Sequence, residues 1–156
     1  MQDEAHRRGD AVALESFAAR FRRCYECARD PVYGGVCLGL TLSGWCTDGL
    51  DKKIGWAQQE ALVGLLMVRL HSRDPSLRAW AEVEFGALYE WVYDKFALKK
   101  HGYALWMVGS GRNPQFTATG DVWGDDGFKN RKENYHHPRC LMLMEELAGQ
   151  IVMGKR

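Results

Sequence analysis

The segment Lys53-Ile-Gly-Trp-Ala-Gln-Gln-Glu60 returns 79 positions later as Lys132-Glu-Asn-Tyr-His-His-Pro-Arg139, and each copy runs into an apolar stretch. In this alignment Trp56 falls on Tyr135, and the closing Glu60 falls on Arg139. Each copy also follows a helical pattern and a glycine-containing, strand-like segment. A repeated unit of helix, hairpin and helix is typical of solenoids and of closed helical barrels.

The two copies differ at two positions where the residue types bear on catalysis. The second copy has His136 and His137 where the first has Ala57 and Gln58. Imidazole takes up and returns a proton near neutral pH, which suits it to acid/base catalysis. The alternative is that both histidines only cap the final helix and bond to the backbone.

Length and composition indicate one folded domain spanning residues 1–156, since 46% of the residues are hydrophobic and 12% are aromatic. The formal net charge of +1 produces no strong electrostatic field of one sign, so nucleic-acid binding is not expected. The longest apolar run is far below the roughly 20 residues that a bilayer span requires, so no membrane association is expected. The first residues are charged and lack the apolar core of a signal peptide, which favours a cytoplasmic protein. The number of cysteines is odd, five, which favours reduced thiols over a framework of disulfides.

The sequence pattern predicts roughly five helices, less than half of a closed barrel. Apolar residues three and four apart predict a helix over 14–28, which should end at Asp30-Pro31. A short hairpin should occupy 36–45. Asp51 is the expected N-cap of an inner helix that is apolar almost all round, and Asp74-Pro75 should start the next helix. A hairpin with a long loop should follow, and the last helix should run from about His136 to Met153.

Four motifs together resemble a known family. Asp30-Pro-Val-Tyr-Gly-Gly35, the segment from Lys53 to Leu62, the turn from Gly102 to Trp106 and Tyr135-His-His-Pro-Arg139 resemble, in order and spacing, the C-terminal part of the N-acylglucosamine 2-epimerase family. That family includes the renin-binding protein, the cellobiose 2-epimerases and the mannose isomerases. The resemblance covers nearly the whole chain from about Gly9 onward.

The resemblance implies an all-α fold, the C-terminal part of an (α/α)6 barrel with short β-hairpins between helices. It also implies a sugar 2-epimerase or aldose–ketose isomerase that moves a proton through an enediolate, using two histidines on opposite faces of the sugar. His136 matches one of these histidines. The expected substrate-binding residues are Lys53, Trp56, Glu60, Trp106 and Arg139. We expect no cofactor and no metal.

The chain departs from the family pattern at two places. Arg131 stands where many members carry an aromatic residue, and the Pro-Gly-His motif that holds the other catalytic histidine is not found before the Asp30 turn. The expectation is therefore a C-terminal fragment or a reduced form, nearly inactive alone, that associates with a missing N-terminal half or with itself.

Three other interpretations stay open. The chain could be a non-catalytic half-barrel that binds carbohydrate or another chain through exposed inner helices. It could be a carbohydrate hydrolase, for which the available acids are Glu60, Asp125 and Asp126. Finally, Cys24, Cys27, Cys37 and Cys46 have the number for a zinc site, although the first pair lies on a predicted helix and the second pair on opposite strands of the predicted hairpin.

Overall fold

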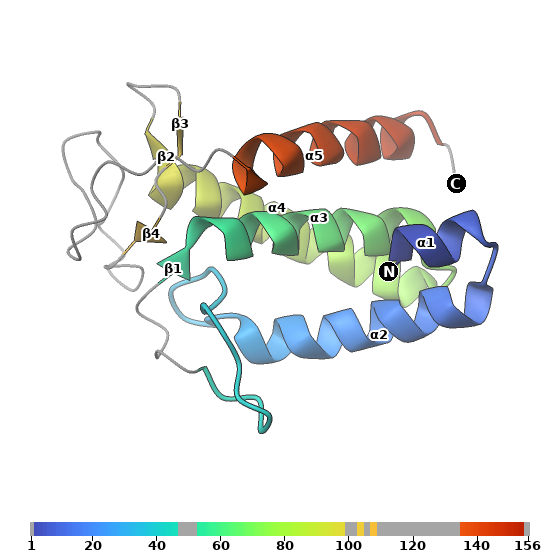
Figure 1. Ribbon diagram of the computed structural model, residues 1–156, viewed down its shortest axis with the longest axis horizontal. Coiled ribbons are helices and arrows are strands. Elements are labelled where there is room, and N and C mark those ends of the chain that lie inside the picture. The colour runs from blue at the N-terminus through green and yellow to red at the C-terminus, as the bar shows by residue number, and fades with distance from the viewer. Residues whose placement is uncertain (1, 47–52, 99–102, 105–106, 109–134, 155–156) are drawn as a thin grey trace.

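The computed structural model describes residues 2–46, 53–98, 103–104, 107–108 and 135–154, most of them in helices (Figure 1). The elements in chain order are α1 (Gln2–Arg7), α2 (Ala11–Ala28), β1 (Lys53–Ile54), α3 (Gly55–His71), α4 (Pro75–Phe96), β2 (Ala97–Leu98), β3 (Tyr103–Ala104), β4 (Met107–Val108) and α5 (His136–Val152). The prediction of a mainly helical fold is confirmed.

Helix α3 is the central helix, as its all-round apolar surface predicts. One side of α3, with Leu62, Leu65 and Val68, packs in a cluster with buried residues of α2 and α4. Another side, with Val63, Leu66 and Leu70, packs against Cys140 and Leu147 of α5. A helix that is covered on two sides needs no polar stripe there, which explains why its sequence is apolar almost all round.

The directions of the helices follow from the repeat. Figure 1 shows α3 and α5 side by side and running the same way, whereas α2 and α4 run the opposite way. The two copies of the repeated motif therefore begin at the same end of the molecule. This arrangement brings equivalent positions of the two copies close to each other.

The turn after α2 forms as the sequence predicts. Helix α2 ends at Ala28, and the Asp30 carboxylate then accepts hydrogen bonds at 3.1 Å from the backbone N–H groups of Val32 and Tyr33. Gly34 and Gly35 have positive φ values of 80° and 75°, and the Trp91 side chain of α4 covers both. A Cβ at Gly35 would lie only 2.6 Å from that ring, so the close approach of turn and helix requires glycine.

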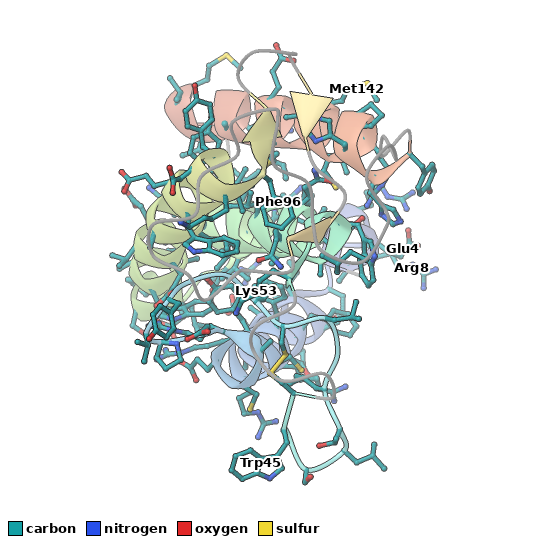
Figure 2. The ribbon with its side chains drawn as sticks, turned by 90° about the vertical axis from the view of Figure 1, so that its left-hand side faces the viewer. Glu4, Arg8, Trp45, Lys53, Phe96 and Met142 are labelled. Atoms are coloured by element: carbon teal, nitrogen blue, oxygen red, sulfur yellow. A yellow bond between two sulfur atoms is a disulfide. The ribbon has the colours of Figure 1, made fainter. Side chains whose placement is uncertain are left out.

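The loop over 36–46 differs from the predicted hairpin. It has only isolated bridges, Arg29 with Val36 and Leu40 with Cys46, and a tight turn in which the Gly44 N–H donates to the Thr41 carbonyl at 3.0 Å. The expectation of reduced thiols is wrong for this loop, because Cys37 and Cys46 form a disulfide across it. Figure 2 shows the loop projecting from the body with Trp45 near its end.

The start of α3 also differs from the prediction. Its N-cap is Ile54, which makes no side-chain capping hydrogen bond, so the assignment of Asp51 as N-cap is wrong. The reason is a long-range strand pair: β1 lies antiparallel to β4, with Lys53 opposite Val108, which keeps this stretch extended. The start of α4 agrees with the prediction, since Asp74 accepts a hydrogen bond of 2.8 Å from the Ser76 N–H.

Within the described ranges, none of the helices combines the length and the apolar composition needed to cross a bilayer.

Candidate functional site

Four of the predicted site residues meet where α3 and α5 begin. The His136 Nδ1 atom lies 2.9 Å from the Glu60 Oε1 atom, and the Arg139 guanidinium donates a hydrogen bond to the same oxygen. The Trp56 ring lies beside the His136 ring, with 5.6 Å between their centroids and 32° between their planes. Residues 76 positions or more apart in sequence thus form one cluster.

Helix geometry explains this convergence. Trp56 and Glu60 are four residues apart in α3, and His136 and Arg139 are three apart in α5, so each pair shares one face of its helix. Because α3 and α5 lie side by side and in the same direction, the two faces meet. Glu60 and Arg139, which occupy equivalent positions of the two copies, form an ion pair in the structure.

The charge state of Glu60 follows from its contacts. Partial burial alone would raise the pKa of this carboxyl group, but hydrogen bonds from Arg139 and His136 outweigh it and hold the pKa below its ordinary value. Glu60 is therefore ionised at neutral pH and acts as an acceptor. A carboxylate that accepts from Nδ1–H fixes the tautomer of a neutral histidine, whose lone pair then sits on Nε2.

A groove lies next to this cluster. It has a volume of about 320 Å³, and α2, residues 36–40 and the first turns of α3 form its walls. Trp56 and Glu60 line the groove among mostly apolar side chains. The His136 side chain is 33% exposed and contacts both of these residues, although it is not itself among the residues that line the groove.

The next histidine faces a different neighbour. The His137 Nδ1 atom lies 2.6 Å from the Gln59 amide nitrogen. His137 and Gln59 line a smaller hollow of about 120 Å³ together with Tyr89 and Tyr93 of α4. Successive residues of a helix point about 100° apart, which separates the two imidazoles.

Lys53 is not part of this cluster. It lies in the interior of the molecule, where Figure 2 labels it. Its side chain has no exposed surface, and its ammonium group lies 3.2 Å from the Asp30 carboxylate, which is equally buried. The buried ion pair gives Lys53 a structural role. The family resemblance assigned Lys53 to substrate binding, and that role stays a prediction.

Gln58 has a comparable structural role. Its amide accepts from the Val36 N–H and donates to the Val36 carbonyl, both at 2.7 Å. This buried polar group therefore has its hydrogen-bond partners in the backbone of the loop. Lys53 and Gln58 together join the loop after α2 to the start of α3.

Sequence reasoning also missed one member of the cluster. The buried Cys140 thiol lies 3.6 Å from the Glu60 carboxylate oxygen. Cys140 follows His136 by four residues in α5, so helical spacing could have placed it on the same face. Trp106, Asp125 and Asp126 lie outside the described residues.

Metal binding finds no support in this part of the chain. Among the described residues, no group of three or more histidine, cysteine, aspartate or glutamate side chains has the arrangement to hold a metal ion. Of the cysteines considered for zinc, Cys37 and Cys46 are joined to each other.

In comparisons with known proteins, no protein-family model and no curated protein matches this chain.

Proposed function

We propose that the chain carries one side of the active site of a sugar 2-epimerase or aldose–ketose isomerase of the N-acylglucosamine 2-epimerase family. The proposal includes the (α/α)6 barrel as the complete fold and His136 as one of its two acid/base residues. The single observation that carries it is the convergence of Trp56, Glu60, His136 and Arg139 from two helices. The motif resemblance points to the same residues independently of the contacts between them.

The arrangement of the helices supports the barrel. In a toroid of helical hairpins, the inner helices run parallel to one another and the outer helices return in the opposite direction. Helices α3 and α5 run parallel to each other, as inner helices would, and α2 and α4 run in the opposite direction, as outer helices would (Figure 1). Further repeats of the same unit would extend this two-layered arrangement.

The proposed chemistry assigns a task to each side chain. The His136 imidazole takes the proton from the carbon next to the sugar carbonyl, and the electron pair of that C–H bond forms the double bond of an enediolate. In an epimerase the second histidine, on the opposite face, then protonates the same carbon, whereas in an aldose–ketose isomerase His136 delivers the proton to the neighbouring carbon. Glu60 accepts from Nδ1–H and so holds the ring in the tautomer with a basic Nε2. Trp56 offers an aromatic face to the apolar side of the sugar, and Arg139 offers guanidinium donors to hydroxyl groups.

The experiment measures proton exchange, which needs only one base. The chain is incubated in D₂O with mannose, fructose or N-acetylglucosamine, and NMR follows deuterium at the carbons next to the carbonyl. We expect incorporation above the buffer rate, loss of it in His136→Gln, and retention in the matched control His137→Gln. Exchange that persists in His136→Ala would refute the assigned role.

A second candidate function is a half-barrel module that associates with another chain. The observation that favours it is a set of exposed apolar side chains on α5 and at its C-cap: Leu141, Met142, Val152 and Met153. Analytical ultracentrifugation tests this idea, since Met142→Glu should shift an oligomer to a smaller species. A monomer that neither binds nor exchanges a sugar would contradict both functions.

A further inference from the structure

A second hollow lies at the end of the molecule opposite the Glu60 cluster. It has a volume of about 420 Å³ and forms where α1, the start of α2, the end of α3 and the start of α4 come together (Figure 1). His71, the last residue of α3, lies on its wall, about 16 Å along the helix axis from Glu60. Nothing in the proposed epimerase chemistry uses this hollow.

The walls of the hollow are rich in cationic and donor groups. The side chains that matter are His6, His71, Ser72, Arg73 and Arg78. The rings of His6 and His71 lie face to face with 4.0 Å between centroids and 32° between planes. Among the described residues that line the hollow none is a carboxylate, so this part of the wall presents mainly guanidinium and imidazole groups.

The nearby carboxylates are already engaged with other groups. Glu15 accepts from the Ser72 hydroxyl at 2.8 Å and from the Arg73 backbone N–H, which fixes the turn between α3 and α4. Asp10 and Asp74 accept from backbone N–H groups at the starts of α2 and α4. These carboxylates therefore stabilise the backbone that surrounds the hollow.

The two arginines of the hollow are available for an anion. In the ranges that the structure describes, no ion pair involves Arg73 or Arg78. Their guanidinium groups come from the turn after α3 and from the first turns of α4, and so approach the hollow from different elements. Guanidinium is the side chain best matched to phosphate oxygens, because it offers several donors in a fixed plane.

We propose that this hollow binds the phosphate group of a small phosphorylated metabolite. A tetrahedral phosphate presents several acceptor oxygens in different directions, which suits donors that converge from α1, α3 and α4. The volume of about 420 Å³ leaves room beyond the phosphate for part of an organic group, and it falls in the range of small-molecule sites. Because this proposal concerns binding at a separate place, it stands independently of the proposed epimerase activity.

Calorimetric titration of the folded chain with inorganic phosphate and with glucose 6-phosphate tests the proposal. Glucose, acetate and sodium chloride at matched ionic strength are the comparison ligands. We expect saturable binding of both phosphates below about 10 mM and none of the comparison ligands. Arg78→Gln should weaken binding by about tenfold or more, because it removes a charge-assisted hydrogen bond.

Matched variants decide between a specific site and general charge. Arg20→Gln removes the same charge from an exposed position of α2 outside the hollow, and should leave phosphate binding unchanged. Arg73→Gln provides a second substitution in the hollow should Arg78→Gln unfold the chain, as judged by circular dichroism. Binding that is absent, that survives both substitutions in the hollow, or that acetate matches in affinity would overturn the proposal.

Discussion

Replacing Lys53 by methionine tests whether the first copy of the motif has a structural role. The ammonium group of Lys53 lies 3.2 Å from the Asp30 carboxylate, and neither side chain has exposed surface. Removing one member of a buried ion pair leaves a charge in a low-dielectric interior, at a cost of about 3–5 kcal/mol. For a chain of this size that corresponds to roughly 6–20 °C in melting temperature.

A double-mutant cycle separates the ion pair from general packing. In Asp30→Asn, the amide oxygen can still accept from the two backbone N–H groups that the carboxylate binds now. Because Lys53→Met with Asp30→Asn removes both charges, we expect the double variant to be more stable than Lys53→Met alone, with a coupling of about 2 kcal/mol. Urea unfolding followed by far-UV circular dichroism gives the free energies.

The outcome that would refute this reasoning is specific. A loss below about 1 kcal/mol in Lys53→Met, or strictly additive losses in the cycle, would mean that the two groups do not form a buried pair. In that case the predicted contact with substrate would be the remaining role for Lys53.

Four further measurements test the glycines, the disulfide and the charge contacts of Glu60. Gly35→Ala should cost about 2–4 kcal/mol in thermal or urea unfolding, since it adds a Cβ at a positive φ against a tryptophan ring; Gly149→Ala, where nothing lies within 4 Å of the added Cβ, should stabilise α5 by up to about 1 kcal/mol. Reduction of the Cys37–Cys46 disulfide should cost about 2–3 kcal/mol, because the bond closes a loop of nine positions, and dithiothreitol should not change the melting temperature of the double serine variant. The pKa of Glu60 is lower in the folded chain than its ordinary value of 4.5, so its contribution to stability is present above that pH and is lost as the pH falls through the folded-state pKa. Glu60→Gln should therefore reduce the free energy of unfolding most at pH 7 and progressively less as the pH falls through the folded-state pKa, and an effect that does not change with pH would contradict the charge contacts.

The helices could be predicted because local signals determine them. Spacing of apolar residues, Asp30-Pro31 and Asp74-Pro75 located α2 and the start of α4 without knowledge of the rest of the fold. The all-round apolar surface of α3 predicted its central place, because a helix without a polar face has to be covered on more than one side.

The errors arise where a distant partner decides the outcome. The start of α3 depends on β4, which is more than fifty positions away, and β4 keeps Lys53 and Ile54 extended. The state of Cys37 and Cys46 depends on how closely the loop brings them together, and their Cα atoms lie 6.0 Å apart, within the range that a disulfide spans. Neither dependence leaves a local pattern in the sequence.

The contact between Glu60 and Arg139 depends on the packing of two helices that are far apart in the sequence. These residues occupy aligned positions of the two copies, and they meet because α3 and α5 lie side by side and run in the same direction. Lys53 has a partner in the preceding turn, Asp30, and the alignment of the two copies does not indicate this contact. The residues of the first copy thus have two different roles. Lys53 and Gln58 fix the start of α3 against the loop. This holds Trp56 and Glu60 in contact with His136. Loss of the buried pair should for that reason disturb the cluster as well as the stability of the fold.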